Sequence, residues 1–511
     1  MIASRIRTLT CGVGAGCALA LLASASLWVS PAPSDVAGTA LSAHPSQIQL
    51  ACPAGIVDPF DTSNVAAATA WTSTSAAPVS PAPTLVTGEA GAIPSALSIA
   101  GQGGGELAGL SAVGCAAPRT SQWIATGATT SGADIVLLLS NPGPTASVVS
   151  VDGFGASGRL NTAPRQVTVP AGSTASVLLA GWFPDESALA VHVQADGGGV
   201  AAWAQASLMN GEIPQGTTLA SASVPAASHT ILGIDPRGTS LLRLVSPSGD
   251  ARVRVWVADS SGVHLLPGGE ATVAEGTTLD MPLDGASNDS APIALLVTAD
   301  QDVVAHTTTI TLGAPWAERA SAWIMRANAT PTTPLTEAAI PGRKQLQDAA
   351  TSVLSSAPIR DTSLATESGV TAVRAHLLLY VPAQAAGSMP QPQSPAPQSG
   401  TPTQAPTPDI WSSPSPTQPQ SDPAQDPQSS GTSPSTPGAV AVRIGERTVY
   451  VAPGIPTLVE APDAAGHILA QSPIHAAIVM SADTAVGTMS TTWNVGTEGI
   501  SAVTGDIRLT N

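Results

Sequence analysis

Short runs in which apolar and polar residues alternate occupy most of the chain, and a period of two is the pattern of half-buried β-strands. The clearest example is residues 133–208, where runs rich in Val, Leu and Thr are separated by Gly, Pro, Asn and Asp. Residues of these four types end strands and reverse the chain. We therefore predict strands at 134–140, 147–153, 165–169, 174–179, 188–194 and 199–207.

The same order of runs recurs twice. Residues 239–312 repeat it, and a third, interrupted copy can be assembled from 373–383 and 438–493. Residues 335–354, between the second and third copies, have the helical periodicity that the copies lack. The turns also correspond between copies: Pro170-Ala171-Gly172 matches Glu275-Gly276 and Pro453-Gly454, and Asp196 matches Asp300 and Asp483.

The three related copies predict an all-β fold of tandem immunoglobulin-like β-sandwich modules. From Asp196 to Asp300 the repeat is about 100 residues long, which suits a sandwich better than one propeller blade. A β-propeller, in which the repeats supply several four-stranded blades, stays the alternative. The predicted modules span residues 84–236, 237–330 and 331–511.

The third module contains a low-complexity segment at residues 382–437, composed almost wholly of Pro, Gln, Ser, Thr, Ala and Gly. It falls where the first two copies have a short turn. The entropy of closing a loop grows only logarithmically with its length, so a long insertion at a surface turn is tolerated. We interpret this segment as a disordered loop insertion and not as a domain boundary.

The N-terminus, residues 1–30, is predicted to be a signal-anchor segment. The uncharged run 9–29 is long enough, at about 1.5 Å per residue, to cross about 30 Å of hydrocarbon. Arg5 and Arg7 precede it, which places the N-terminus in the cytoplasm and the bulk of the chain outside a single-pass membrane anchor. A cleaved signal peptide, ending near Ala25, is the alternative. Residues 31–83, rich in Pro, Ser, Ala and Thr, are predicted to be a disordered stalk.

The charge argues against a nucleic-acid-binding protein, and the cysteines suit an exported one. The net charge is −17 and charged residues make up 10% of the chain, without the clustered cations that a nucleic-acid partner needs. Cys52 and Cys115 are the two cysteines beyond the apolar segment. In an exported chain they are available to each other, and we predict a disulfide between them, the alternative being two free buried thiols.

No sequence motif indicates an enzymatic reaction. The chain has no G-x-S-x-G elbow, and its histidines lack metal-ligand spacing; His192, His306 and His475 fall in related strands but at different places in them. The G-x-G-x-x-A match at 103–108 has no βαβ context. Acidic pairs such as Asp185-Glu186, or Asp300 with Asp302, are interpreted as turn residues. The sequence therefore assigns no catalytic, cofactor-binding or metal-ligating residue.

Tryptophans recur at strand positions and could line a sugar-stacking surface, although packing between sheets is the favoured interpretation. An exposed cluster of them would favour a glycan-binding module. The residues concerned are Trp123, Trp203, Trp256, Trp323 and Trp493.

The run CAAPRTSQWIATGATTSGADIVLLLSNPGPTASVVSVDGFG from Cys115, together with DPRGTSLLRLVSPSGDARVRVWV in the second copy, carries a resemblance. The chain resembles an actinobacterial family of exported, membrane-anchored proteins of unknown function encoded near cell-envelope glycosyltransferases. The resemblance implies a location and a role at the cell envelope. From the β modules held by one membrane anchor we expect a non-enzymatic interaction or scaffolding protein. Its expected partners are envelope proteins such as a glycosyltransferase, or cell-wall glycan; glycan binding or glycan hydrolysis is the alternative.

Overall fold

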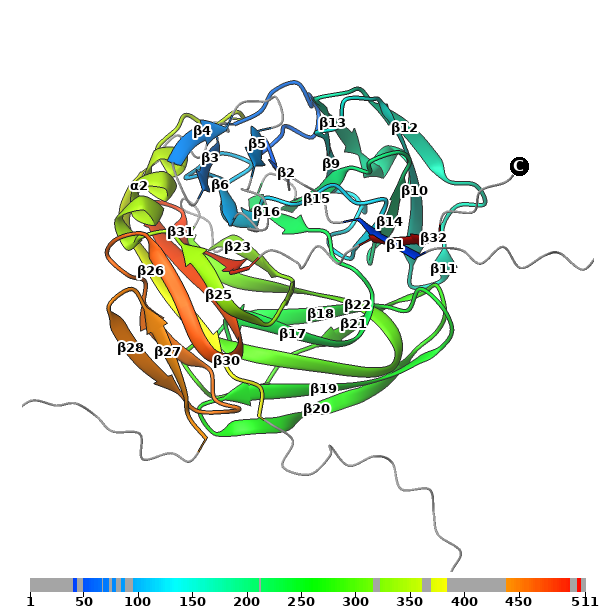
Figure 1. The fold of residues 1–511 in the computed structure, drawn as a ribbon. Helices are drawn as coiled ribbons and strands as arrows, with labels where there is room; N and C mark the ends of the chain where they lie inside the picture. The colour runs from blue at the N-terminus through cyan, green and yellow to red at the C-terminus, as the bar shows by residue number, and fades with distance from the viewer. Residues whose placement is uncertain are drawn as a thin grey trace, which may run out of the picture. The chain divides into compact units, whose positions relative to one another are not determined.

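The computed structural model describes residues 40–43, 49–66, 68–72, 76–79, 84–87, 95–210, 213–315, 322–360, 369–383, 438–496 and 503–506. These residues form two compact units. One contains the antiparallel pair β1 (Ala40–Ala43) and β32 (Val503–Asp506). The other, Gln47–Gly499, contains every other element and is all-β apart from short helical segments, as predicted (Figure 1).

The predicted membrane anchor and nearly all of the predicted insertion lie outside the described residues. Within the part of the chain that the structure describes, no helix is both long and apolar enough to cross a membrane.

The first copy has strands close to those predicted. They are β8 (Ser121–Ile124), β9 (Ala133–Asn141), β10 (Ser147–Gly155), β11 (Gly158–Arg159), β12 (Arg165–Val169), β13 (Ser173–Leu178), β14 (Ala190–Ala195), β15 (Ala201–Asn210) and β16 (Ile213–Ser221), with the 3₁₀ segment η1 (Leu179–Gly181) after β13.

The second copy is built from β17 (Ala226–Ile234), β18 (Thr239–Val245), β19 (Ala251–Asp259), β20 (Gly262–Val273), β21 (Thr278–Pro282), β22 (Ile293–Pro315), β23 (Ala322–Ala329) and β24 (Pro331–Thr332). The third is built from β25 (Leu335–Ile340), β26 (Val370–Tyr380), β27 (Val440–Ile444), β28 (Arg447–Val451), β29 (Thr457–Glu460), β30 (Gly466–Thr484) and β31 (Gly487–Asn494). The helix α2 (Arg343–Leu354) occupies the second half of the stretch with helical periodicity, and β25 its first third.

Strand pairing repeats in the three copies. One sheet runs β13-β9-β15-β16 in the first copy, and the same relationships recur as β21-β18-β22-β23 and β29-β26-β30-β31. The opposing sheet runs β12-β10-β14-β8, then β20-β19-β22-β17, then β28-β27-β30-β25. In the second and third copies the long strands β22 and β30 serve both sheets. β17 begins before the predicted boundary at residue 236, yet it pairs with β22 of the second copy.

A glycine turn confirms the correspondence between copies. Gly172, Gly276 and Gly454 all have positive φ values, of 60°, 66° and 80°. Each donates its backbone N–H to a carbonyl at the end of the copy's first hairpin strand; the acceptors are Gly143, Ser246 and Val381. In the third copy the described chain stops two residues after Val381 and resumes at Gly438, ahead of β27. The predicted insertion therefore falls between β26 and β27, where the other copies have their short turn.

The first copy departs from an open sandwich. An antiparallel bridge between Trp123 of β8 and Ser223, just beyond β16, joins the two sheets at one side. At the other side the consecutive strands β12 and β13 contact each other. The two sheets thus form a nearly closed barrel, and the immunoglobulin-like form of the modules stays a prediction.

The prediction of a disordered stalk over residues 31–83 is wrong for the described part of that range. The strands are β2 (Gln49–Cys52), β3 (Ala68–Thr72) and β4 (Ala76–Val79), followed by β5 (Thr84–Thr87), β6 (Ala96–Gln102) and β7 (Gly109–Gly114). Leu50, Ile56 and Val57 are buried against Val136 and Trp203 of the first copy. Small residues that cannot build a core alone are buried here because the first copy supplies the other half of that core.

The predicted disulfide between Cys52 and Cys115 is present. It joins the end of β2 to the residue that follows β7, across a sequence separation of 63. The segment taken for a stalk is therefore covalently tied to the folded unit.

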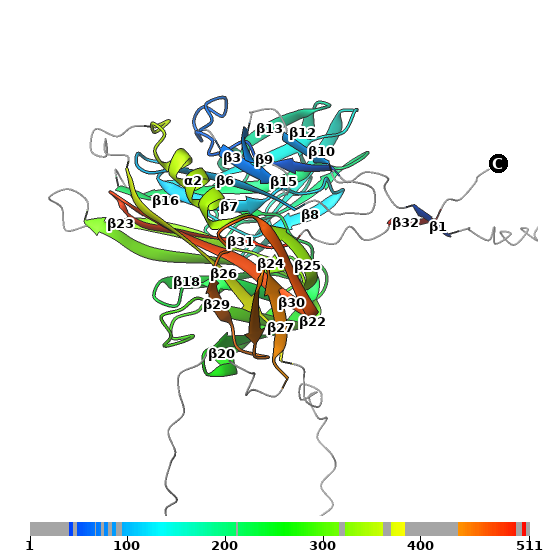
Figure 2. The same cartoon turned by 60° about the vertical axis from the view of Figure 1, so that its left-hand side comes forward.

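The N-terminal sheet, of order β4-β3-β6-β7, lies between the third and first copies. Its edge strand β7 contacts β16 and β31, and β23 contacts the same two strands, so β7, β16, β23 and β31 form a closed circuit. The approach of β7 to β16 is close: a Cβ at Gly109 would lie 2.0 Å from the Thr217 carbonyl oxygen. Helix α2 covers β3, β6 and β26 with a buried face that includes Leu346, Val353 and Leu354 (Figure 2).

Candidate binding pocket and buried polar side chains

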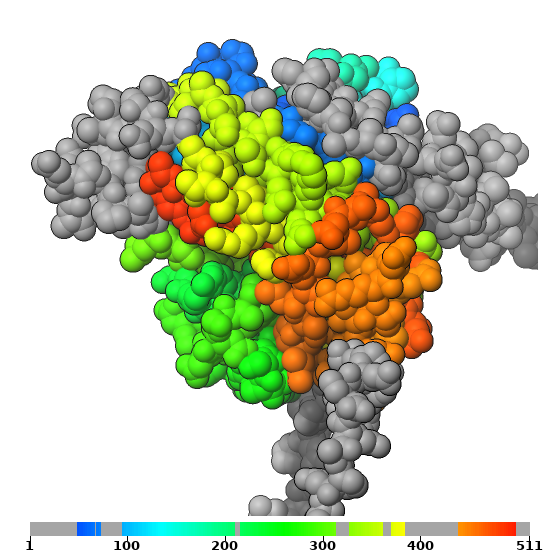
Figure 3. Space-filling view, turned by 90° about the vertical axis from the view of Figure 1, so that its left-hand side faces the viewer, coloured from blue at the N-terminus to red at the C-terminus, as the bar shows by residue number. Residues whose placement is uncertain are grey.

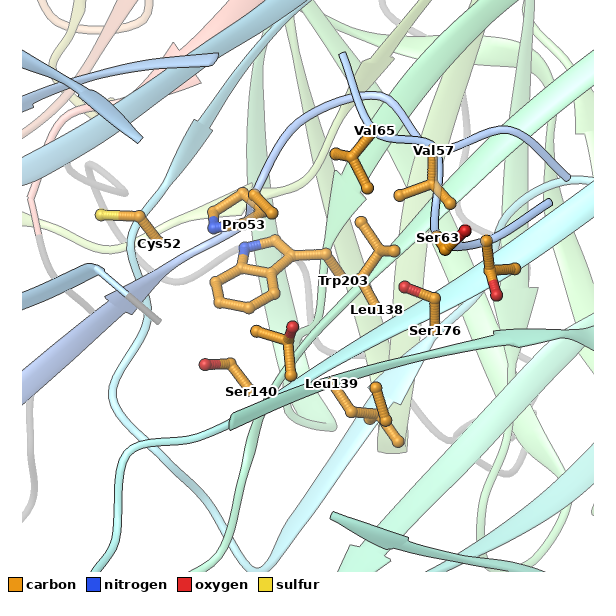
Figure 4. Close-up of a pocket in the computed structure, with 14 residues that line it drawn as sticks. Cys52, Pro53, Val57, Ser63, Val65, Leu138, Leu139, Ser140, Ser176 and Trp203 are labelled. Atoms are coloured by element: carbon orange, nitrogen blue, oxygen red, sulfur yellow. The ribbon is translucent and has the colours of Figure 1, made fainter. Parts of the chain in front are cut away.

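A pocket of about 350 Å³ opens between the N-terminal segment and the first copy (Figure 4). Its floor is the sheet formed by β9, β13 and β15, and its roof is the loop that follows β2. The lining residues are Cys52, Pro53, Ala54, Val57, Thr62, Ser63, Val65, Leu138, Leu139, Ser140, Thr174, Ala175, Ser176 and Trp203.

Strand alternation determines which side chains face the pocket. On β9, Leu137 and Leu139 pack in the interior of the first copy, while Leu138 packs toward the N-terminal segment. Because successive side chains point to opposite faces, Ser140 shares the face of Leu138. Thr174 is paired with Ser140 across the sheet, so it presents its side chain on the same face.

The roof is held over the floor by a side chain of the floor. Gln205 of β15 is fully buried and bonds both backbone groups of Val57: its Oε1 accepts from the Val57 N–H at 2.7 Å, and its Nε2 donates to the Val57 carbonyl at 2.6 Å. The Cys52–Cys115 disulfide fixes the start of the roof loop. Two attachments at separate points make this a pre-formed pocket.

The pocket has a closed end and an open rim. Ser140 and Trp203 are each 1% exposed and form the closed end. The Trp203 indole N–H donates to the Gly114 carbonyl at 3.1 Å, so its polar end is already occupied. Ser63 is exposed, and Thr174 and Ser176 are partly exposed, so hydroxyl groups surround the mouth.

The lining chemistry is polar but uncharged. None of the lining residues in the described chain is Asp, Glu, Lys, Arg or His. The hydroxyl oxygen of Ser140 is buried and has no hydrogen-bond partner among the described residues. That oxygen is also closed to solvent, so its missing partner is an energetic cost to the fold and not a contact offered to a ligand.

Two buried histidines belong to junctions between copies and not to this pocket. His306 of β22 lies at the first junction, defined as the contact of the first copy with the second around Trp123, Ala125 and Val304. Its Nδ1 accepts the Ala125 N–H at 3.4 Å and its Nε2 lies 3.0 Å from the Ser223 hydroxyl. Burial, with the nearby charges of His229 and Arg243 as smaller causes, lowers the pKa of His306 to about 3.

Arg243 of β18 is the charged member of the first junction. Its guanidinium makes a bidentate pair with Asp280, with both N···O distances 2.7 Å. It also donates across the junction to the carbonyls of Gly127 at 2.5 Å and Leu189 at 3.1 Å. Only 9% of its side chain is exposed. The guanidinium is therefore saturated by partners and acts as a structural tie between two copies.

His475 of β30 lies at the second junction, the contact of the second copy with the third around Leu232, Leu378 and Tyr380. Its Nδ1 is 2.7 Å from the Thr332 hydroxyl. Burial lowers the pKa of His475 to about 4. In Figure 3 the surface of residues 438–496 lies directly beside that of the second copy, as this contact requires.

The buried His229 and the partly buried His192 also have local partners. His192 of β14 stacks on Trp123 with ring centroids 4.4 Å apart, and burial lowers its pKa. His229 lies 2.6 Å from the Val303 carbonyl oxygen through Nε2, and burial lowers its pKa as well. The histidines in related strands are not brought together. Among the described residues no cluster of three metal-ligating side chains exists.

The acidic residues singled out in the sequence are on the surface. Asp185 is exposed, with a positive φ of 58°. Asp300 and Asp302 are exposed where β22 passes from one sheet to the other, not in a hairpin turn. The match of Asp483 to Asp196 and Asp300 is wrong, because Asp483 lies where β30 pairs with β31. Asp196 and Asp300 do correspond: each accepts the N–H of the second residue of an equivalent strand, Val148 of β10 and Arg252 of β19.

The glycine motif and the tryptophans have structural places. Residues 103–108 join the antiparallel strands β6 and β7, and a Cβ at Gly103 would lie 2.3 Å from the Leu354 carbonyl oxygen, so this loop packs against the end of α2.

Trp123, Trp203 and Trp493 are buried and Trp256 is partly buried; the side chain of Trp323 lies outside the described residues. Packing is thus the role of the described tryptophans.

Sequence reasoning missed two side chains that matter here. Arg243 carried a signal, because it is the single charge in the apolar run LLRLV of a predicted strand. Gln205, which holds the pocket roof, carried none.

Residues 68–387 match the model of a family of unknown function, DUF5719. No curated protein matches the chain. No solved structure matches it either.

Proposed function

The chain belongs to this DUF5719 family of unknown function, and from its own residues we propose that it is an exported, membrane-anchored protein that acts without catalysis as an interaction or scaffolding module of an actinobacterial cell envelope. The observation that carries this proposal is how the buried ionisable side chains are used. Arg243, His306 and His475 each bond a residue of another strand at a junction between copies. They hold neighbouring copies together, and none of them lines the pocket described above.

The glycan-hydrolysing alternative has no support in the pocket. Glycoside hydrolysis uses two carboxyl groups on either side of the scissile bond. The lining residues described here include no carboxylate. The expected partners of a scaffold are envelope proteins such as a glycosyltransferase, or cell-wall glycan.

Two features support an extracytoplasmic location. The Cys52–Cys115 disulfide is of the kind that forms in oxidising compartments. The run 9–29 follows Arg5 and Arg7, the charge arrangement of an anchor whose C-terminal side is translocated. Alkaline phosphatase fused after Asn511 is expected to be active in the full chain and inactive when residues 1–30 are deleted. Equal activity in the two fusions contradicts export through this segment.

The interaction role is tested by photo-crosslinking in intact cells. Large apolar side chains on the surface are the natural contact points of a scaffold, and Phe60 and Leu312 are 73% and 79% exposed. A photoreactive residue at position 60 or 312 is expected to capture a specific envelope protein. Ser187, which is exposed and polar, is the matched control position. Identical, abundance-weighted products at all three positions would count against a scaffold.

A further inference from the structure

A serine and a histidine form a hydrogen-bonded pair on the surface of the first copy. The Ser121 hydroxyl oxygen of β8 lies 2.8 Å from Nε2 of His192 on the adjacent strand β14. Ser121 is exposed, so a molecule from solution can reach it, while His192 is partly buried. A serine hydroxyl within hydrogen-bond distance of an imidazole is the arrangement that activates a serine as a nucleophile.

Strand alternation places this pair outside the core of the first copy. Val191 packs in the interior, so the next side chain along β14, that of His192, points outward. Residues paired across antiparallel strands share a face; Ser121 pairs with Gln194, and Trp123 pairs with His192. Ser121, His192 and Gln194 therefore stand together on one outer face of the sheet.

The imidazole ring of His192 is held in place before any ligand arrives. It stacks on Trp123, with the ring centroids 4.4 Å apart and the two planes 9° apart. In the tautomer that carries its proton on Nδ1, Nε2 accepts the hydrogen bond from the Ser121 hydroxyl. The stacking thus fixes the plane in which Nε2 meets that hydroxyl.

The charge state of His192 suits a base. Burial lowers its pKa below the ordinary value of about 6.5; the charge of Asp152, its partner across the sheet, raises the pKa, and that of Arg159 lowers it. The ring is therefore neutral at neutral pH. A neutral imidazole is the form that takes up the proton of a hydroxyl.

Gln194 adds a hydrogen-bond donor beside the serine. It is exposed and lies directly opposite Ser121 in the register of β14 and β8. A side-chain amide carries two N–H groups, and such a donor stabilises the negative charge that develops on an acyl oxygen during nucleophilic attack. A nucleophile, a base and an amide donor thus share one accessible surface.

We propose that Ser121 is an acceptor site for an acyl group, which it takes from an activated ester. The Ser121 oxygen forms a bond to the acyl carbon, and the bond from that carbon to the leaving oxygen breaks. The hydroxyl proton passes to Nε2 of His192 and from there to the leaving oxygen. The products are an O-acyl serine and an alcohol.

This acylation modifies the chain's own serine, so it is compatible with a role that involves no catalysis. It does not rest on the scaffolding role either. Loss of partner capture would leave the reactivity of Ser121 untouched, and an inert Ser121 would leave partner capture untouched.

The test is incubation of the purified full-length chain with p-nitrophenyl acetate, followed by mass spectrometry of its peptides over time. Ser121 is expected to be acetylated at least about a hundredfold faster than Ser187, because a general base contributes about that factor. Ser187 is the internal control, an exposed serine whose hydroxyl has no hydrogen bond to a histidine among the described residues. Equal rates at the two serines, or acetyl groups on His192 with Ser121 unmodified, overturn the proposal.

Variants assign the roles of the three side chains. His192→Gln is expected to slow acetylation of Ser121 by about a hundredfold. Gln194→Ala is expected to slow it by about tenfold, less than the loss of a buried donor, because this amide is exposed to water. Ser187→Ala is the matched control and leaves the rate unchanged. An unchanged rate in folded His192→Gln contradicts the role of the imidazole.

The pH profile separates a base from a side chain with a structural role only. The rate of Ser121 acetylation is expected to fall as the pH drops through the pKa of His192, which lies below about 6.5. Asp152→Asn should move the midpoint to lower pH, and Arg159→Gln should move it to higher pH, because the two charges act on the ring in opposite directions. A midpoint that stays fixed in both variants contradicts His192 as the base.

Discussion

The two junctions that join the copies both contain an apolar cluster, and the first adds a buried charge. Trp123, Ala125 and Val304 pack at the first junction, and Leu232, Leu378 and Tyr380 pack at the second. At the first junction a buried guanidinium, Arg243, also pairs with Asp280 and donates to carbonyls of the first copy, which makes a polar joint. The same strand arrangement is thus compatible with an apolar contact and with an added polar joint, which is directional. The repeat therefore defines where copies meet but not how they are held.

Each junction also buries one histidine. At the first, Nδ1 of His306 accepts from a backbone N–H, so the proton of the neutral ring lies on Nε2 and points to Ser223. At the second, Nδ1 of His475 lies 2.7 Å from the Thr332 hydroxyl, whose oxygen also lies 3.0 Å from the Thr230 carbonyl oxygen. Protonating His306 adds a proton on Nδ1, which faces a backbone N–H donor.

The largest expected effect is the loss of the polar joint. Arg243→Met keeps the aliphatic stem but leaves Asp280 and three carbonyls without their donor, and we expect the free energy of unfolding to fall by about 3–5 kcal/mol. Urea denaturation measures it. Arg254→Met is the control, because Arg254 pairs with Glu270 on the surface and should contribute less than about 1 kcal/mol.

A second variant removes both charges of the ion pair from the first junction. In Arg243→Met with Asp280→Leu the carboxylate is no longer unpaired, so we expect part of the lost stability to return. If Arg243→Met alone unfolds within about 1 kcal/mol of the wild type, the guanidinium is not the tie that its geometry indicates.

The repeat could be predicted from the sequence because its signals are local. Period-two runs and turn residues such as Gly172 and Gly454 act within a few residues of themselves. The stalk was wrongly predicted because Leu50 and Ile56 are buried by Val136 and Trp203, which lie far along the chain. Composition alone cannot show that a small-residue segment completes the core of another.

The pocket could not be predicted for a related reason. Its roof and its floor come from segments separated by most of the first copy, and Gln205 holds them together over a sequence separation of 148. Ser140 and Thr174 look like ordinary strand residues in the sequence, because nothing local shows that their shared face is covered. Arg243 is the reverse case, because a single charge within an apolar strand does indicate a buried partner.

Acid pH is expected to lower the stability of both junctions. The folded-state pKa values of about 3 for His306 and about 4 for His475 lie below the ordinary value of about 6.5, so the unfolded chain binds the protons first. Stability is therefore intact above about pH 6.5 and falls as the pH drops. Each histidine is expected to lower the unfolding free energy by about 2 kcal/mol between pH 7 and pH 5.

The effects of the two histidines on stability differ at lower pH. The contribution of His475 should level off near pH 4, while that of His306 continues to about pH 3. Urea midpoints across pH 3–7 for His306→Asn and His475→Asn, each compared with the wild type, measure the two slopes. His467→Asn replaces an exposed ring as the control. Parallel curves for wild type and both junction variants would refute burial of neutral rings.

The smallest expected effects come from the removal of single hydroxyl groups at the two junctions. Thr278→Val removes one bond across the first junction, from the Thr278 hydroxyl to the Ala188 carbonyl at 2.9 Å, and should lower the unfolding free energy by about 1 kcal/mol. Thr332→Val removes the bond to Thr230 and also leaves Nδ1 of His475 unpaired, so about 1–2 kcal/mol is expected.

The pH dependence of these threonine variants distinguishes the joints further. Thr332 contacts the ring of His475, so Thr332→Val should alter the stability profile between pH 4 and pH 6.5. Thr278 has no hydrogen bond with His306 among the described residues, so Thr278→Val should shift the whole profile without changing its slope. An altered slope in Thr278→Val would mean that the polar joint and its histidine act as one network, and the two junctions would then differ in cooperativity as well as in composition.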